Sequence, residues 1–349
     1  MRVAIVSPNI IRITPYVSFY FDLLVENGHK VDVFFPERTH EHFDKKDYYG
    51  FSKWNSKFNV INYFKYKKWI KRQISNKYDF VICLSMQTGF LLYGTLLKRF
   101  FKNNYIIDIR DYSYEKYAIF RNVEKKVVEN AKLCIVSSPE FCSFLPKHHY
   151  LIAHNISFDQ KEHFLFNKRT SGAIIISYVG AISYYTQCKK MIDLVLNDDR
   201  FCLFFYGRGT ESARVDQYIN EIGCERIKSF GSFEPGDKKK IILSSDILFN
   251  VYGNEDIRLR TALSNKLYDS LYYKKPILNS VGTFMSRISP NSSFEIDFSD
   301  AYIMDKLYSW YFNIDEKSFN LHCDELLDSF QNENLKTKMA IIKSLSRSE

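Results

Sequence analysis

Lys266 and Asp269 are the residues of this 349-residue sequence whose types and spacing most clearly suggest chemistry. They lie three residues apart in a predicted helix, so both side chains project from one face. Ser264 or Asn265 can cap this helix and leave its backbone N–H groups free to meet an anion. Lys266 lies in the first turn of the helix, where a positive charge is unfavourable to the helix dipole unless a negative ligand is near. Asp269, one turn further on, can accept hydrogen bonds from a vicinal diol. The pair could hold the phosphate and ribose ends of a nucleotide; an i,i+3 ion pair on a solvated helix is the alternative.

Three loops that follow predicted strands add phosphate-binding chemistry. Gly180 follows one strand and permits the close approach of a phosphate. Arg208 lies between two glycines after a second strand, where its guanidinium can clamp diphosphate oxygens. The loop at 252–254 follows a third strand, just before the helix of Lys266. Glycine after a strand is ordinary turn chemistry, but ligands of open parallel sheets bind beyond the carboxyl ends of the strands. These features together indicate a site for a nucleoside diphosphate.

The elements that must position these residues alternate between strands and helices, which is typical of α/β domains. The first half predicts strands at 2–7, 30–35, 80–84, 105–108, 133–137 and 150–152, with helices near 15–26, 66–76, 89–100 and 113–130. The second half predicts strands at 173–180, 201–206, near 227, 247–251 and 276–279, with helices near 187–196, 212–221, 235–243 and 261–271. The polar, aromatic segment 36–59 predicts a long loop, and the polar stretch 154–171 predicts an interdomain linker.

The chain is too long for one ordinary core, and the predicted fold class is α/β with two Rossmann-like domains facing across a cleft. The predicted division is an N-terminal domain at 1–160 and a C-terminal, nucleotide-binding domain at 161–285. A mostly helical segment at 286–349 follows, and it can pack back on the N-terminal domain.

Composition limits the class of protein further. Hydrophobic residues make up 46% of the chain, which allows a sizeable buried core. No apolar run of about 18 residues occurs, so no membrane span is expected, and the first residues become polar too quickly for a signal peptide. Seven cysteines without CxxC spacing indicate a reducing compartment and no zinc site. The loop after the first strand lacks GxGxxG, which disfavours a tightly bound dinucleotide.

The net charge of +9 is concentrated in the basic and aromatic segment 65–72. The residues of this segment that we expect to contact an acceptor or a membrane are Lys67, Lys68, Trp69, Lys71 and Arg72. Cations interleaved with aromatic rings can bind an anionic membrane surface, and less readily nucleic acid. The alternative is a solvated helix face with Trp69 and Ile70 packed inward. We expect a membrane or acceptor contact here and no nucleic acid partner.

Several segments together resemble GT-B glycosyltransferases, most closely the glycosyltransferase family 4 group that builds bacterial capsules and O-antigens. The most specific segment is Asn-Lys-Leu-Tyr-Asp at 265–269, followed by Lys-Pro-Ile at 275–277. Shorter similarities lie at 108–111, 131–138, 153–155, 178–180, 205–209, 229–231 and 245–247. The likeness covers the chain from its start to about residue 278.

The resemblance implies sugar transfer from a nucleotide-sugar donor to a lipid-linked or polysaccharide acceptor, with retention of the anomeric configuration. It implies that the C-terminal domain binds the donor and that the N-terminal domain binds the acceptor. No metal or other cofactor is implied. The implied location is the cytoplasm, peripherally at the inner face of the cell membrane.

The sequence departs from the family pattern at two positions. Asp269 matches the second acidic residue of the family's paired-glutamate motif, but the first position, eight residues earlier, is Thr261. The histidine often found after the fourth strand is absent, and Asp111 is then the best acid/base or acceptor-orienting candidate. An ion pair with Arg110 or a helix N-cap is the alternative role for Asp111. A nucleotide-sugar 2-epimerase of the same fold and an inactive binding subunit are the rival functions.

Overall fold

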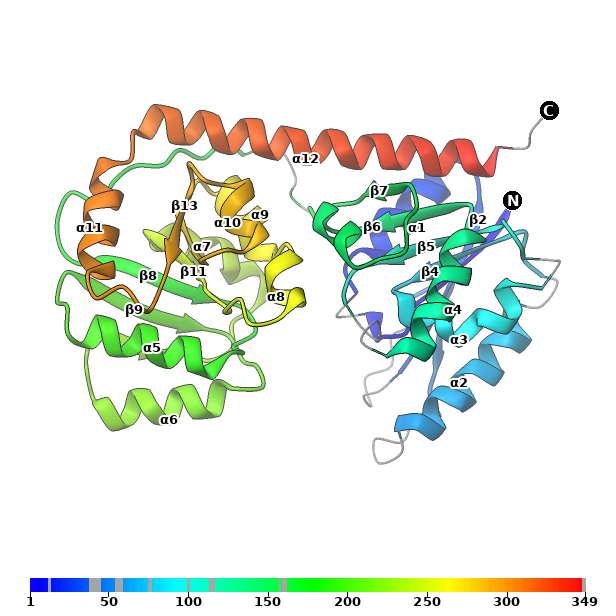
Figure 1. Cartoon of the computed structure of the whole chain (residues 1–349), viewed down its shortest axis with the longest axis horizontal. Coiled ribbons are helices and arrows are strands. Elements are labelled where there is room, and N and C mark those ends of the chain that lie inside the picture. The colour runs from blue at the N-terminus through cyan, green and yellow to red at the C-terminus, as the bar shows by residue number, and fades with distance from the viewer. Residues whose placement is uncertain are drawn as a thin grey trace. The chain divides into compact units, whose positions relative to one another are not determined.

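The chain folds into two compact units, and one of them is formed by two separate stretches of the sequence. The computed structural model describes residues 1–11, 14–37, 45–53, 59–74, 77–98, 101–112, 117–156, 158 and 162–346. Unit 1 comprises Met1–Asn155 and Gln331–Glu349, and unit 2 comprises Ile156–Phe330. Each unit is an α/β domain with a parallel sheet and helices on both faces (Figure 1), which confirms the prediction of two Rossmann-like α/β domains.

Unit 1 is built on a seven-stranded sheet in the order β3-β2-β1-β4-β5-β6-β7. Its strands are β1 (Arg2–Val6), β2 (Lys30–Pro36), β3 (Tyr48–Phe51), β4 (Phe80–Leu84), β5 (Tyr105–Ile109), β6 (Leu133–Val136) and β7 (Tyr150–Ile152). Its helices are α1 (Val17–Glu26), α2 (Asn59–Ile74), α3 (Met86–Leu96), α4 (Ala118–Glu129) and the 3₁₀ turn η2 (Pro139–Ser143). The prediction of a loop over 36–59 is wrong at 48–51, where the chain forms β3. This short edge strand pairs with β2 and lacks the apolar run of a central strand, so no local pattern marked it.

Unit 2 is built on a six-stranded sheet in the order β10-β9-β8-β11-β12-β13. Its strands are β8 (Ile174–Val179), β9 (Phe201–Tyr206), β10 (Ile227–Ser229), β11 (Ile247–Asn250), β12 (Ile277–Ser280) and β13 (Ser293–Ile296). Its helices are α5 (Tyr185–Leu196), α6 (Ser212–Ile222), η3 (Pro235–Asp237), α7 (Lys238–Ser244), α8 (Ile257–Thr261), α9 (Asn265–Tyr272), α10 (Phe284–Ile288) and α11 (Ile303–Asn313). The helical prediction after residue 286 missed β13, which pairs with β12. The predicted helix at 261–271 begins too early, because the backbone is extended at Ala262 and Ser264 and α9 starts only at Asn265; α8, which ends at Thr261, was not predicted.

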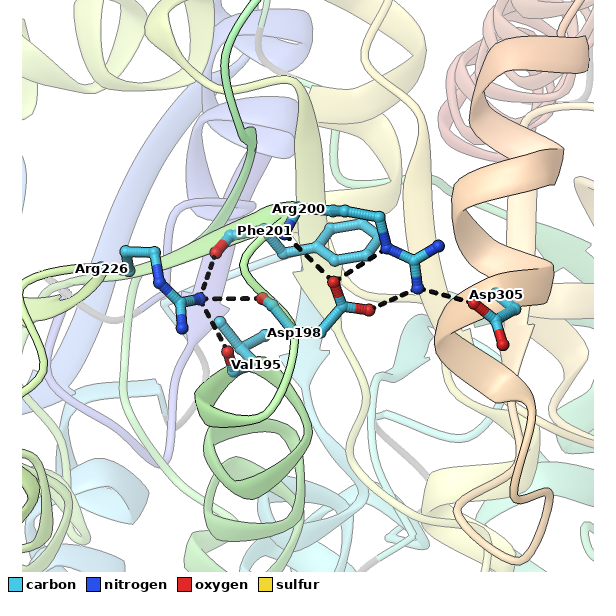
Figure 2. A network of polar contacts seen from close by, with 6 residues as sticks. All are labelled: Val195, Asp198, Arg200, Phe201, Arg226 and Asp305. Atoms are coloured by element: carbon cyan, nitrogen blue, oxygen red, sulfur yellow. Dashed lines mark hydrogen bonds and ion pairs between the residues drawn. The ribbon is translucent and has the colours of Figure 1, made fainter.

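An arginine network fixes the end of α5 at the amino edge of the second sheet (Figure 2). The Arg226 guanidinium donates to four backbone carbonyl oxygens: Nη1 to those of Val195, Asp198 and Phe201, at 2.8, 2.8 and 3.0 Å, and Nη2 to that of Leu196 at 3.2 Å. Carbonyls at the end of a helix have no partner within the helix, so the bonds to Val195 and Leu196 cap α5. Arg200 bridges the carboxylates of Asp198 and Asp305, at 2.6 and 2.7 Å, and so joins the turn after α5 to α11.

The long helix α12 (Glu316–Leu345) contributes to both units. Its residues to Phe330 belong to unit 2, whereas Ile341 and Leu345 are buried in the core of unit 1. Asn334 clamps the helix to the chain at His154: its Oδ1 accepts from the His154 N–H at 2.7 Å, and its Nδ2 donates to the His154 carbonyl at 3.1 Å. None of the described helices combines the length and apolar character needed to cross a bilayer.

We expect Asn334→Ala to lower the free energy of unfolding by about 1–2 kcal/mol, because two backbone groups lose their partners. Asn332→Ala, at an exposed position of the same helix, should change it by less than about 0.5 kcal/mol. Urea unfolding of both variants measures the difference. Equal stabilities would show that the Asn334 clamp contributes nothing.

Candidate functional site

Two glycine turns lie against each other at the carboxyl ends of β8 and β9. Gly180 and Gly207 both have positive φ, at 120° and 129°. The Gly180 N–H donates to the Tyr206 carbonyl at 2.8 Å, and the Gly207 N–H donates to the Gly231 carbonyl at 2.6 Å. A Cβ on Gly207 would lie 1.9 Å from the Gly180 carbonyl oxygen. Only glycine fits at 207, and the packing holds the Gly180 turn at the edge of the sheet.

Lys266 is a buried cation beside the Gly180 turn. Its side chain comes from the first turn of α9, and the residue is only 8% exposed. The Nζ atom donates to the Tyr252 hydroxyl at 2.7 Å and lies 4.1 Å from the centre of the Tyr178 ring. Among the described residues, no carboxylate oxygen lies within ion-pair distance of this nitrogen. Burial lowers the pKa of Lys266. A buried ammonium with phenol rings for neighbours is arranged to receive an anion.

Asp269 is also buried, but it pairs with a different lysine. Both of its carboxylate oxygens lie 2.7 Å from the Nζ atom of Lys238, the first residue of α7. Burial raises the pKa of Asp269, and the nearby Lys238 and Lys266 oppose that shift. The structure therefore shows no solvated i,i+3 ion pair between Lys266 and Asp269. It shows two cations around one buried carboxylate, a cluster with an excess positive charge.

The other predicted donor-site residues surround this cluster less closely. Ser264 stands at the N-cap position of α9, but its Oγ donates to the Asn250 side chain at 2.8 Å rather than capping the helix. Asn265 is the first residue of α9. Arg208 lies in the turn after β9, where its half-exposed guanidinium pairs with Asp216. The structure thus brings Gly180, Lys266 and Asp269 to one edge, with Arg208 on the neighbouring strand end.

A cavity of about 210 Å³ opens at the same edge, where β11, β12 and β13 end. It is lined by Gln187, Lys190, Val251, Gly253, Asn254, Glu255, Ser280, Val281, Ile296, Asp297, Phe298 and Ser299. The Gln187 amide donates to Glu255 at 2.9 Å, and a Cβ on Gly253 would collide with both side chains. The cavity therefore offers amide and carboxylate groups suited to hydroxylated ligands.

Sequence reasoning missed three residues of this region, namely Lys238, Gln187 and Glu255, and it named Tyr252 only as part of the loop at 252–254. Only Glu255 carried a signal, since it lies in a polar loop directly after a strand. Thr261, at the position of the missing family carboxylate, is buried, and its hydroxyl donates to the Ile257 carbonyl at 2.6 Å. Within the described residues, no cluster of three or more His, Cys, Asp or Glu side chains could hold a metal ion.

In unit 1, Asp111 follows β5 and is exposed. The partner of Arg110 is Asp108, whose two oxygens accept from Arg110 Nε at 2.8 and 2.9 Å. Asp108 is completely buried, and burial raises its pKa. Arg110 also donates to the Ala153 carbonyl at 2.8 Å. The buried pair is a structural brace at the carboxyl end of β5, immediately before Asp111. The alternative N-cap role concerns residues 113–116, which lie outside the described part of the chain.

The basic segment of unit 1 lies on α2. Trp69 packs against the rings of Phe34, Phe51 and Tyr66 at 5.6–5.9 Å between centres. A cavity of about 340 Å³ lies beside it, and its charged lining residues are Lys53, Lys65, Lys68 and Arg72. Lys67 and Lys71 are partly exposed. The aromatic rings thus anchor α2 to the edge of the sheet, and the cations remain at the surface.

Solved structures of GT-B glycosyltransferases match this chain over nearly its whole length. Sucrose-phosphate synthase from Thermosynechococcus elongatus matches with a TM-score of 0.75 and 12% identity over 98% of both chains. The lipopolysaccharide outer core galactosyltransferase WaaB in its apo form matches with a TM-score of 0.63 and 14% identity, over 99% of this chain and 100% of that one. Anabaena HepE in complex with UDP and glucose matches with a TM-score of 0.63 and 11% identity, over 99% of this chain and 100% of that one. No protein-family model and no curated protein sequence matches the chain. The likenesses show that the chain has the GT-B fold.

Proposed function

We propose that this protein transfers a sugar from a nucleotide-sugar donor, bound by unit 2, to a lipid-linked or polysaccharide acceptor. The observation that carries the proposal is the buried Lys266 ammonium, which lies beside the Gly180 turn and has no carboxylate partner within the described residues. A diphosphate would supply the missing negative charge. The similar HepE structures hold UDP, and UDP with glucose, which makes UDP the first nucleotide to test.

In the proposed reaction, negative charge develops on the leaving diphosphate. Lys266 and the backbone N–H groups at the start of α9 would stabilise that charge without a metal. Asp269 would accept hydrogen bonds from the ribose hydroxyls, either while it stays paired with Lys238 or after the ribose displaces the Lys238 ammonium. Asp111 would orient the acceptor hydroxyl or take its proton. Retention of the anomeric configuration, the family 4 assignment and a role in surface polysaccharide synthesis are proposed from the sequence resemblance.

The test is a thermal-shift panel of UDP, GDP, CMP, ADP and dTDP. We expect one nucleoside diphosphate to stabilise the native protein, by about 2.7 kcal/mol at a hundredfold excess over its dissociation constant. Asp269→Ala should abolish this stabilisation. Asp199→Ala, at an exposed carboxylate near the amino edge of the same sheet, should preserve it. A panel without any shift would contradict the proposed donor site.

Turnover separates the proposed transferase from its rivals. Release of the nucleoside diphosphate that depends on an added acceptor supports a transferase. Interconversion of nucleotide-sugars without acceptor would indicate the epimerase. Binding of nucleotide without turnover of any donor would indicate a binding subunit.

A further inference from the structure

The cavity at the carboxyl ends of β11, β12 and β13 combines buried lining residues with a charged rim. Its buried lining residues are Gln187, Val251, Gly253, Ser280 and Ile296. Its rim consists of the three charged lining residues, Lys190, Glu255 and Asp297, all of which are exposed. The volume of about 210 Å³ is below the range of about 300–1,000 Å³ that is usual for drug-sized ligands. The cavity therefore suits one small polar ring.

Gln187 connects the rim to the interior of unit 2. Its Nε2 atom donates to Glu255 Oε1 at 2.9 Å and holds that carboxylate at the cavity. Its own Oε1 atom is buried and accepts no hydrogen bond from any described residue. A buried acceptor without a partner is unfavourable, and a ligand hydroxyl is a donor of the kind that the wall lacks.

The cavity begins one residue away from the Lys266 ammonium. Lys266 Nζ donates to the Tyr252 hydroxyl at 2.7 Å, and the next residue, Gly253, lines the cavity. Ser280 Oγ accepts from the N–H groups of Tyr252 and Gly253, at 3.0 and 2.8 Å, and so fixes this stretch of backbone. In a nucleotide-sugar, the sugar is bonded directly to the terminal phosphate. A sugar whose diphosphate lies at Lys266 would therefore reach this cavity.

The charges of the rim favour a neutral ligand over an anionic one. Glu255 and Asp297 are carboxylates, and Lys190 is the single cation among the lining residues. Hydrogen bonds from Ser299 lower the pKa of Asp297, which keeps this carboxylate ionised at neutral pH. The Lys190 ammonium lies 5.4 Å from the centre of the Phe298 ring. The excess negative charge would repel a carboxylate on the ligand, whereas hydroxyl groups can donate to both rim carboxylates.

We propose that this cavity binds the sugar ring of the donor and that Glu255 selects a neutral sugar over a uronic acid. Gln187 is a positioning residue, because it holds Glu255. Thr261, at the position of the missing family carboxylate, cannot supply this charge, and Glu255 supplies it from the loop after β11. The inference rests on the proposed function, since it takes the diphosphate to lie at Lys266, and it adds the chemical class of the sugar.

The experiment is titration calorimetry of the full chain with UDP, UDP-glucose and UDP-glucuronate. The wild type should bind UDP-glucose at least about fivefold more tightly than UDP-glucuronate. Glu255→Gln should reduce this preference to about twofold or less, and Gln187→Met should reduce it as well. Lys190→Gln should increase it at least about twofold, because the rim then loses its cation. The ratio of the two affinities cancels any effect of a variant on the nucleotide itself.

Glu295→Gln is the matched control, since Glu295 is an exposed carboxylate of β13 outside the cavity lining. It should keep the preference of the wild type. If the thermal-shift panel selects another nucleotide, its hexose and uronic acid conjugates replace the UDP pair. Unchanged thermal midpoints show that the variants fold.

Two results would overturn the proposal while nucleotide binding succeeds. One is equal binding of the two sugars, or tighter binding of UDP-glucuronate, by the wild type. The other is a preference that Glu255→Gln and Lys190→Gln leave unchanged, which would place the sugar elsewhere. Failure of UDP and of every other nucleotide to bind would instead reject the proposed donor site, and this inference with it.

Discussion

Lys266→Met is expected to lower the affinity for the nucleoside diphosphate about 100-fold, and turnover by at least as much. The lost interaction is a charged hydrogen bond to phosphate in a buried site, which is worth about 3 kcal/mol. The same change should leave the free energy of unfolding unchanged, or raise it by about 1 kcal/mol. The reason is that burial lowers the pKa of Lys266, so the folded protein disfavours the ammonium form more than the unfolded chain does. Titration calorimetry and urea unfolding measure the two effects.

A loss of binding joined to unchanged or greater stability distinguishes a ligand-binding lysine from a structural one. Lys275→Met is the matched control, since Lys275 follows the same helix and donates to the Leu243 carbonyl at 3.0 Å. It should bind the nucleotide like the wild type. If Lys266→Met binds normally as well, or if it unfolds more easily than Lys275→Met, Lys266 is a structural residue and the donor site is misplaced.

Gly207→Ala is expected to destabilise the protein by about 3 kcal/mol or more. Its Cβ would fall 1.9 Å from the Gly180 carbonyl oxygen, and both groups belong to backbone at the ends of adjacent strands. The positive φ of 129° adds strain for any residue with a side chain. Relief requires one turn to move, so a folded fraction of the variant should also bind the nucleoside diphosphate weakly.

Gly236→Ala provides the comparison, because a Cβ at Gly236 meets no atom within 4 Å. This variant should differ from the wild type by less than about 1 kcal/mol. Urea unfolding gives both stabilities, and the thermal shift with nucleotide gives the binding. Similar stabilities of the two variants would show that the Gly180 and Gly207 turns are not tightly coupled.

The central strands and the main candidate site were predictable because they depend on local patterns. β8, β9 and β11 are mainly apolar runs, and parallel strands bring the segments that follow them to one edge. Gly180, Lys266 and Asp269 were expected at that edge, and the structure places them there. Their roles stay predictions, and so do those of the α2 cations and Asp111.

The contacts that set the electrostatics of the site could not be predicted from local sequence. Lys238 pairs with Asp269 across 31 positions, and Tyr252 meets Lys266 across 14. Neither lysine nor tyrosine carries a sequence signal for its tertiary partner. The extended backbone at Ala262 that separates α8 from α9 has no glycine or proline to mark it, so the predicted helix began at 261, before the true start of α9 at Asn265.

The division of unit 1 into two stretches of sequence affects how the protein emerges from the ribosome. Residues 156–330 form all of unit 2, so that unit can fold as soon as this stretch has been translated. Unit 1 leaves the ribosome earlier but lacks Ile341 and Leu345, which are synthesised after unit 2 and fill part of its core. The nascent chain therefore reaches its native state in an unusual order: the domain translated first is completed last.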